Sequence, residues 1–192
     1  MPLSKTIQTF TTYPILDTAF VARVNAAIPQ LLALLPSTIT YSPRNNFTVE
    51  LPEKLKNDLV DTLPFYSVVC LVSVCAPNST IPFHTDSDRL ISLNFPIQNT
   101  SGLTLIHSET APAANEITTV STTAPDGSSI SYPIAENFVP SNPITSSGDT
   151  PTMANIGMFY SVNNSTANPA VILSFRILHA DEQKAFDYFA AL

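Results

Sequence analysis

The chain has 192 residues, of which 12% are charged, and its net charge of −7 corresponds to a sequence pI near 4.7. This length predicts a single domain, residues 1–192, with a core of useful size. Lys and Arg total only 8 and are scattered, so no surface for nucleic acid is expected. The most apolar stretch, residues 19–35, is too short and too polar to cross a membrane, and the N-terminus does not resemble a secretory signal. We therefore expect a cytoplasmic protein.

Helices are predicted within residues 1–65, as a support for the β core that follows. Asp17 is a suitable N-cap before a run of apolar residues at helical spacing, and Pro29 is expected to break or kink that helix. Pro52 and Glu53 mark a second, shorter helix, because proline suits the first helical position and a carboxylate suits the first turn.

After the second helix the sequence pattern changes to that of strands. Residues 67–75 are rich in β-branched side chains, residues 89–97 alternate between apolar and polar side chains, and residues 102–107 form a further short run. Residues 156–162 and 171–177 flank a turn rich in Asn and predict a final β-hairpin. The pattern is therefore typical of a mainly β protein.

A Ser-, Thr- and Pro-rich stretch, about residues 108–152, interrupts the predicted β core of residues 66–180. It is too long for a simple loop in a compact domain. Within it, residues 117–120 and 129–132 favour a hairpin, and the remainder is expected to be an irregular flap. Residues 181–189 predict a short C-terminal helix. Helices followed by many short strands predict a sandwich or open barrel with the helices packed outside it.

His84 and Asp86 are the most informative pair of residues for function. In an extended backbone, residues two apart project to the same side, so this imidazole and this carboxylate point into one space. A 2-His-1-carboxylate iron site receives its first two ligands in this way. The pair predicts a metal site whose third ligand lies elsewhere. The alternative is a hydrogen-bonded pair that fixes a turn, because His-x-Asp alone is frequent by chance.

Two longer stretches place this pair in a recognisable context. The first is Ile81-Pro82-Phe83-His84-Thr85-Asp86, followed by Arg89 and then Leu93-Asn94-Phe95-Pro96-Ile97. The second is Tyr160-Ser161-Val162-Asn163-Asn164, followed by Asn168-Pro169-Ala170 and Leu173-Ser174-Phe175-Arg176. Together they resemble the Fe(II)/2-oxoglutarate-dependent oxygenases, especially the aspartyl/asparaginyl β-hydroxylase-like and phage-encoded members. The resemblance covers roughly residues 68–177.

The resemblance implies a fold and an activity. The fold is a double-stranded β-helix of the jelly-roll or cupin type, with N-terminal helices packed outside it and a short C-terminal helix. The implied cofactors are Fe(II) and 2-oxoglutarate, and the implied reaction is hydroxylation of a small molecule or a peptide. His84 and Asp86 match the family's first two metal ligands.

Two positions depart from the family's pattern. Tyr160 stands where the family has its second metal-binding histidine, and Ala170 stands where the family has the arginine that pairs with 2-oxoglutarate. A neutral phenol is a poor metal ligand, because its ordinary pKa is about 10. Alanine supplies no charge-assisted clamp. Both positions are expected on opposing strands of the final hairpin.

Four residues are candidates to supply the missing groups. His107 and Tyr160 are candidate third metal ligands, and Arg89 and Arg176 are candidates to bind the co-substrate. Each has an alternative: His107 as a hydrogen-bonded residue at a strand end, and Arg89 as the partner of a nearby aspartate. Arg176 is expected to face solvent if the apolar residues that alternate with it form the core.

The sequence leaves two main functions open. One is an oxygenase in which His84 and Asp86 hold Fe(II). The other is a pseudoenzyme that binds no cofactor and acts through protein partners or self-assembly. The low charge of the chain and its Ser-, Thr-, Asn- and Pro-rich composition resemble those of exposed phage or viral structural proteins, so virion association is the alternative location. A jelly roll of another lineage, with an accidental His-x-Asp match, is a third interpretation.

Overall fold

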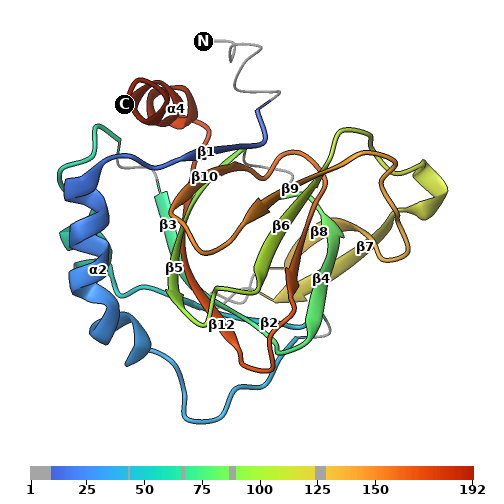
Figure 1. The fold of residues 1–192 in the computed structure, drawn as a ribbon, viewed down its shortest axis with the longest axis horizontal. Coiled ribbons are helices and arrows are strands. Elements are labelled where there is room, and N and C mark those ends of the chain that lie inside the picture. Colours follow the sequence, from blue (N-terminus) through green and yellow to red (C-terminus); the bar gives the residue numbers. More distant parts are fainter. Residues whose placement is uncertain (1–9, 43, 66–67, 87–89, 124–128) are drawn as a thin grey trace.

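The computed structural model describes residues 10–42, 44–65, 68–86, 90–123 and 129–192. The strands among them form two facing six-stranded sheets (Figure 1). In spatial order, the first sheet contains β1 (Thr12–Pro14), β10 (Thr152–Asn155), β5 (Ile91–Gln98), β12 (Ala170–Ile177), β3 (Val68–Cys75) and β2 (Asn46–Glu50). The second contains β7 (Thr118–Thr123), β8 (Ser129–Ala135), β4 (Ser79–His84), β11 (Tyr160–Asn164), β6 (Leu103–Ser108) and β9 (Pro143–Ser147). Neighbouring strands in both sheets are antiparallel.

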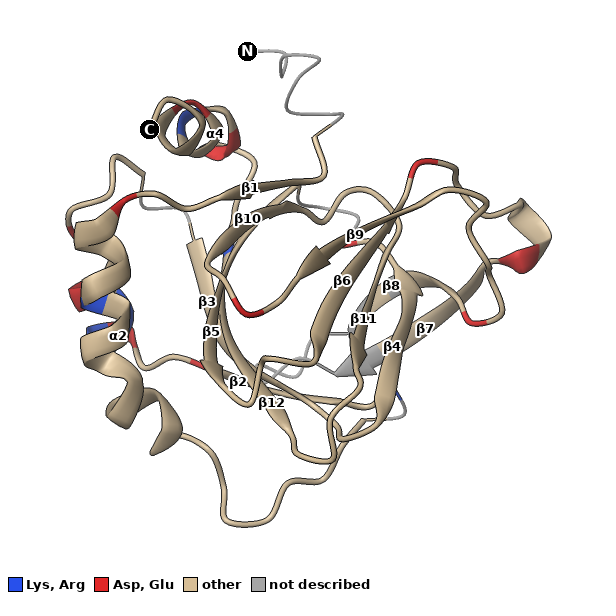
Figure 2. Ribbon diagram, in the orientation of Figure 1, with Lys and Arg blue, Asp and Glu red and all other residues tan. Residues whose placement is uncertain are grey.

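Helices cover the outer face of the first sheet. They are α2 (Thr18–Leu32), α3 (Glu53–Val60) and α4 (Glu182–Ala190), and a short 3-10 turn, η1 (Ala114–Glu116), lies elsewhere in the chain. Phe20 of α2 is wholly buried, and its ring lies 5.1 Å from that of Phe95 on β5 and 5.3 Å from that of Phe175 on β12. Burying one such side chain stabilises the fold by about 2–3 kcal/mol. Charged residues lie mostly on helices and loops rather than on the strands (Figure 2).

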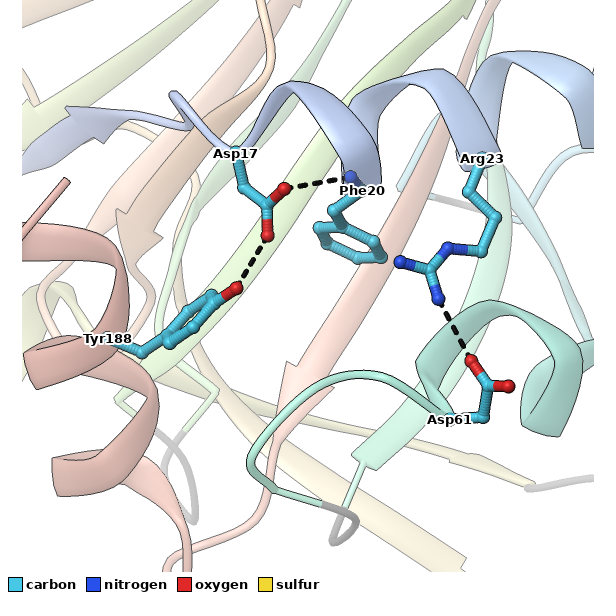
Figure 3. Close-up of polar contacts among 5 residues, drawn as sticks. All are labelled: Asp17, Phe20, Arg23, Asp61 and Tyr188. Carbon is cyan, nitrogen blue, oxygen red and sulfur yellow. Dashed lines mark hydrogen bonds and ion pairs between the residues drawn. The ribbon is translucent and has the colours of Figure 1, made fainter.

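Polar contacts fix the three helices relative to one another (Figure 3). Asp17 caps α2 as predicted, because its Oδ1 accepts a hydrogen bond from the amide of Phe20 at 2.9 Å. The Tyr188 hydroxyl of α4 donates to the other oxygen of Asp17 at 2.7 Å. Arg23 of α2 forms an ion pair of 2.9 Å with Asp61, which follows α3. The cap alone contributes about 1 kcal/mol.

Of the break or kink predicted at Pro29, the break is wrong. The helix α2 continues to Leu32, and the amide of Ala33 donates to the carbonyl of Pro29 at 3.1 Å. Proline removes one amide and disturbs one carbonyl a turn earlier, which weakens a helix without always ending it. Here the last turn also buries Leu31 against the core, and this packing offsets the cost.

The predicted hairpin within residues 108–152 is confirmed, since β7 pairs with β8. The expectation of an irregular flap for the remainder is wrong in part, because residues 143–147 form β9, which pairs with β6, and β10, which pairs with β5, begins at the last residue of this stretch, Thr152. β9 is a largely exposed edge strand, so its sequence carries little of the apolar pattern by which strands are recognised. Strands β1 and β2 also lie within residues 1–65, so that region contributes to the sheets as well as to the helices.

The predicted final hairpin is wrong. β11 pairs with β4 and β6 in the second sheet, whereas β12 pairs with β3 and β5 in the first. The chain between them crosses from one sheet to the other. An Asn-rich turn signals a reversal of the chain, but it does not determine which strand becomes the partner.

The two sheets enclose an interior of their own. Apolar residues from both sheets fill part of it: Cys75, Ile81, Leu103, Leu105, Ala154, Ile156, Tyr160, Val162 and Ala170. A separate and larger apolar cluster lies between the first sheet and the helices. No helix in the described part of the chain is long and apolar enough to cross a membrane.

Candidate functional site

Three rings from adjacent strands form one row in the second sheet. His84 on β4 lies directly opposite Tyr160 on β11, and Tyr160 lies directly opposite His107 on β6. Directly opposite residues project to the same face of a sheet, and Tyr160 packs in the interior between the sheets. The ring of Tyr160 is 4.3 Å from that of His84 and 5.9 Å from that of His107. A phenol therefore stands between the two imidazoles.

His84 is the last residue of β4, and its side chain is a neutral hydrogen-bond acceptor. Its Nδ1 lies 2.7 Å from the carbonyl oxygen of Pro82, which only accepts, so Nδ1 carries the proton and Nε2 carries the lone pair. Burial, reinforced by the positive charge of Arg44, lowers the pKa of His84 to about 4. At neutral pH its Nε2 is therefore available to a metal ion or to a hydrogen-bond donor.

His107 is wholly buried and is anchored in a similar way. Its Nε2 donates to the carbonyl oxygen of Asn155 at 2.9 Å, and its Nδ1 has no hydrogen-bond partner among the described residues. Burial lowers the pKa of His107, so it too is neutral at pH 7. Two strand spacings, about 10 Å, separate the backbones of His84 and His107. The structure therefore places this candidate ligand in the same row as His84, but beyond the ring of Tyr160.

Asp86 follows β4 and carries the charge of the site. Its Oδ2 lies 3.2 Å from Nη1 of Arg176, an ion pair whose angles do not meet hydrogen-bond geometry. The carboxylate of Asp86 is buried, whereas the side chain of Arg176 is 25% exposed. A partly buried pair of this kind compensates the carboxylate charge but stabilises the fold only modestly.

Arg176 does not simply face solvent, and this expectation is wrong. The apolar residues that alternate with it on β12, including Leu173 and Phe175, do form the core beneath the helices. The opposite face of that strand borders the interior between the two sheets, so Arg176 can reach Asp86. Arg89 lies outside the described residues.

The two departures from the family pattern lie on different sheets and toward opposite ends of them, because Tyr160 is paired with His84 at the end of β4, whereas Ala170 lies beside the turn that joins β3 to β4. Tyr160 on β11 and Ala170 on β12 belong to the same interior apolar cluster. Ala170 is wholly buried and lies opposite Cys75 on β3. The expectation that they lie on opposing strands of one hairpin is therefore wrong, because β11 and β12 belong to different sheets.

The side chains present do not fit a three-ligand Fe(II) centre. Such a site needs three protein ligands around one ion, with further positions left open. Within the described ranges, no three His, Cys, Asp or Glu side chains are grouped closely enough to hold a metal. His84 and Asp86 supply two candidate ligands, and the ring next to His84 in the row is a phenol.

Several residues near the site carried no signal in the sequence. Arg44 precedes β2 by only a short link, yet its charge acts on His84, some forty positions later in the chain. Asn155 holds His107, and its own side-chain amide donates to the carbonyl of Phe10 at 2.9 Å. These contacts depend on chain segments that meet only in the folded protein, so no local motif reveals them.

A small hollow lies at the other end of β6 from His107. It has a volume of about 280 Å³, includes open solvent, and is lined by Asn94, Leu103, Leu105, Ser147, Thr152 and Ile172 among others. The Oδ1 of Asn94 accepts hydrogen bonds from Ser92 and Ser174, each at 2.9 Å. Because none of its lining residues belongs to the row of rings, it does not enlarge the candidate site.

Comparison with known proteins supports the fold. No protein-family model matches the sequence, and no curated protein matches it. An oxidoreductase of the 2OG-Fe(II) oxygenase family from Burkholderia pseudomallei matches the structure with a TM-score of 0.51 and 15% identity, over 90% of this chain and 87% of that chain.

Two further solved structures are more distant. A prolyl-4-hydroxylase from Pseudomonas putida has a TM-score of 0.44 and 11% identity, over 91% of this chain and 95% of its own. An uncharacterised protein from Klebsiella pneumoniae with a double-stranded β-helix domain has a TM-score of 0.40 and 10% identity, over 79% and 81%. At such identities the Burkholderia likeness shows the fold alone. The predicted mainly β, double-stranded β-helix fold is confirmed.

Proposed function

We propose that this chain is a degenerate, oxygenase-like double-stranded β-helix protein that acts by binding rather than by hydroxylation. The observation that carries the proposal is the place of Tyr160. It stands directly opposite His84, in the row position next to the candidate metal ligand, with its ring 4.3 Å away. Because position 160 carries a phenol instead of an imidazole, only His84 and Asp86 remain as candidate metal ligands at this point of the barrel.

The charge arrangement at Asp86 supports the same proposal. Its carboxylate is already paired with the guanidinium of Arg176 at 3.2 Å. A metal ion that bound Asp86 would have to share or replace this cation. With only one further protein ligand, it would gain little in return. We therefore expect weak metal binding or none.

The remaining groups suit a polar ligand. His84 presents a neutral acceptor nitrogen, Asp86 an acceptor carboxylate and Arg176 a guanidinium with several donors. Such groups recognise a small polar molecule or a segment of a peptide. A protein partner or a second copy of the chain is the wider alternative, and light scattering that shows a strict monomer would count against self-assembly.

Calorimetric titration with Mn(II), with and without 2-oxoglutarate, tests the proposal. We expect no heat that depends on His84, so the wild type and His84→Ala should give the same baseline. Tyr160→His is the matched control, because it completes the three-ligand set and should gain Mn(II) binding. Micromolar binding by the wild type that His84→Ala abolishes, with succinate formed from 2-oxoglutarate, would refute the proposal.

A retained oxygenase is the second candidate function. One observation favours it: His84 donates its Nδ1 proton to the carbonyl of Pro82, which leaves Nε2 unprotonated. Histidines that bind metals are commonly oriented by such a contact. The same titration separates the two functions, because only the retained oxygenase predicts metal affinity in the wild type.

A further inference from the structure

Asp86 and Leu90 are held together by two other parts of the chain. The carbonyl of Ile156 accepts from the amide of Asp86, and the amide of Ile156 donates to the carbonyl of Leu90, both at 2.9 Å. From the C-terminal side, Arg176 pairs with the carboxylate of Asp86 at 3.2 Å, and Glu182 accepts a hydrogen bond from the amide of Leu90. The end of β12 and the start of α4 thus contact Asp86 and Leu90, respectively.

Glu182 is a wholly buried carboxylate, and both of its oxygens are used. Oε1 accepts from the amide of Leu90, and Oε2 accepts from Nδ1 of His179 at 2.8 Å. It also lies in the first turn of α4, where the helix dipole favours a negative charge. Burying a carboxylate is costly unless such contacts compensate it.

The docking of α4 does not by itself require this carboxylate. Ala185, Phe186 and Phe189 are buried against the core beneath the helices and provide the apolar contacts of α4. An apolar side chain in place of Glu182 would extend that surface. The carboxylate instead fixes the start of the helix at one point, the amide of Leu90.

We infer that Glu182 is a positioning residue that couples α4 to Asp86 of the candidate site. The coupling runs through three hydrogen bonds: the Leu90 amide donates to Glu182, the Ile156 amide donates to the carbonyl of Leu90, and the Asp86 amide donates to the carbonyl of Ile156. It rests on the proposed function only in taking His84 and Asp86 as the site. A displacement of the start of α4, by a partner or by a substitution, is transmitted to the carboxylate at the barrel interior.

Amide hydrogen exchange measured by NMR tests the coupling. In Glu182→Ala we expect exchange at Leu90, Ile156 and Asp86 to be about tenfold faster or more, because a charge-assisted hydrogen bond is lost. Amides in the centre of β12 should keep their rates once global stability is matched. Lys184→Ala is the control, since it removes the neighbouring Lys184–Asp181 pair of 3.0 Å and leaves Leu90 untouched.

A conservative variant keeps the test decisive if Glu182→Ala does not fold. Glu182→Gln retains an oxygen that can accept from Leu90 but loses the charge, so exchange at the three amides should be about threefold faster than in the wild type. Faster exchange confined to α4, uniform acceleration over the whole chain, or no change in Glu182→Gln would overturn the inference. The metal titration does not affect this readout, so the two proposals fail independently.

Discussion

The buried imidazole of His84 makes the fold sensitive to mild acid. Burial lowers the pKa of His84 from its ordinary 6.5 to about 4, so between these values the unfolded chain binds a proton that the folded protein does not. The stabilising contribution is therefore fully present above pH 6.5 and is lost as the pH falls toward 4.

The magnitude follows from proton linkage. At 1.36 kcal/mol per pH unit, the interval from 6.5 to about 4 corresponds to a loss of about 3 kcal/mol in the free energy of unfolding. Most of it, about 2 kcal/mol, should be lost between pH 7 and about pH 4.5. For a single domain this is a large part of the total stability.

Urea unfolding followed by circular dichroism, at several pH values across this range, measures the effect. His84→Gln is the variant to compare, because its side chain can still donate to the carbonyl of Pro82 but does not titrate. The titration of His107 and of the carboxylates contributes equally to the pH dependence of stability in both proteins. The free energy of the wild type should therefore fall more steeply with acid than that of His84→Gln. Parallel curves would refute the assignment of a neutral, buried His84.

Three further changes have expected outcomes in the same unfolding assay. Phe20→Ala should lower the free energy of unfolding by about 3–5 kcal/mol, because it removes the ring that contacts Phe95 and Phe175 and leaves a cavity; a loss below 1 kcal/mol would contradict the packing. Arg176→Met should cost about 2–3 kcal/mol by leaving the carboxylate of Asp86 buried without its cation, and adding Asp86→Leu should recover most of this loss. Tyr188→Phe should cost about 1 kcal/mol through the lost hydrogen bond to Asp17, and an unchanged stability would show that this contact is not maintained in solution.

Local signals in the sequence were sufficient for some elements. Asp17 predicted the start of α2, and Pro52 with Glu53 predicted α3, because caps and first-turn preferences act within a few residues. The alternation within β5 also predicted a strand with one apolar face. The edge strands β1 and β9 were missed, because they are short or exposed and carry little alternation.

The candidate site was predictable only in part. The spacing of His84 and Asp86 is local, so the sequence could place them together. The row with Tyr160 depends on the pairing of β4 with β11, which are far apart in the chain. Glu182 gave no sign of a role, since its contact with Leu90 joins positions 92 residues apart. Such contacts follow from the assembly of the two sheets rather than from any motif.

The row on β4, β11 and β6 also has a genetic consequence. Codons for tyrosine and histidine differ by one base, so a single-nucleotide substitution replaces the phenol at position 160 with an imidazole. The backbone pairing of Tyr160 with His84 and His107 does not depend on which ring the codon specifies. A gene that encodes this barrel therefore stands a single nucleotide away from one with an imidazole at position 160, with the pairing of the strands unchanged.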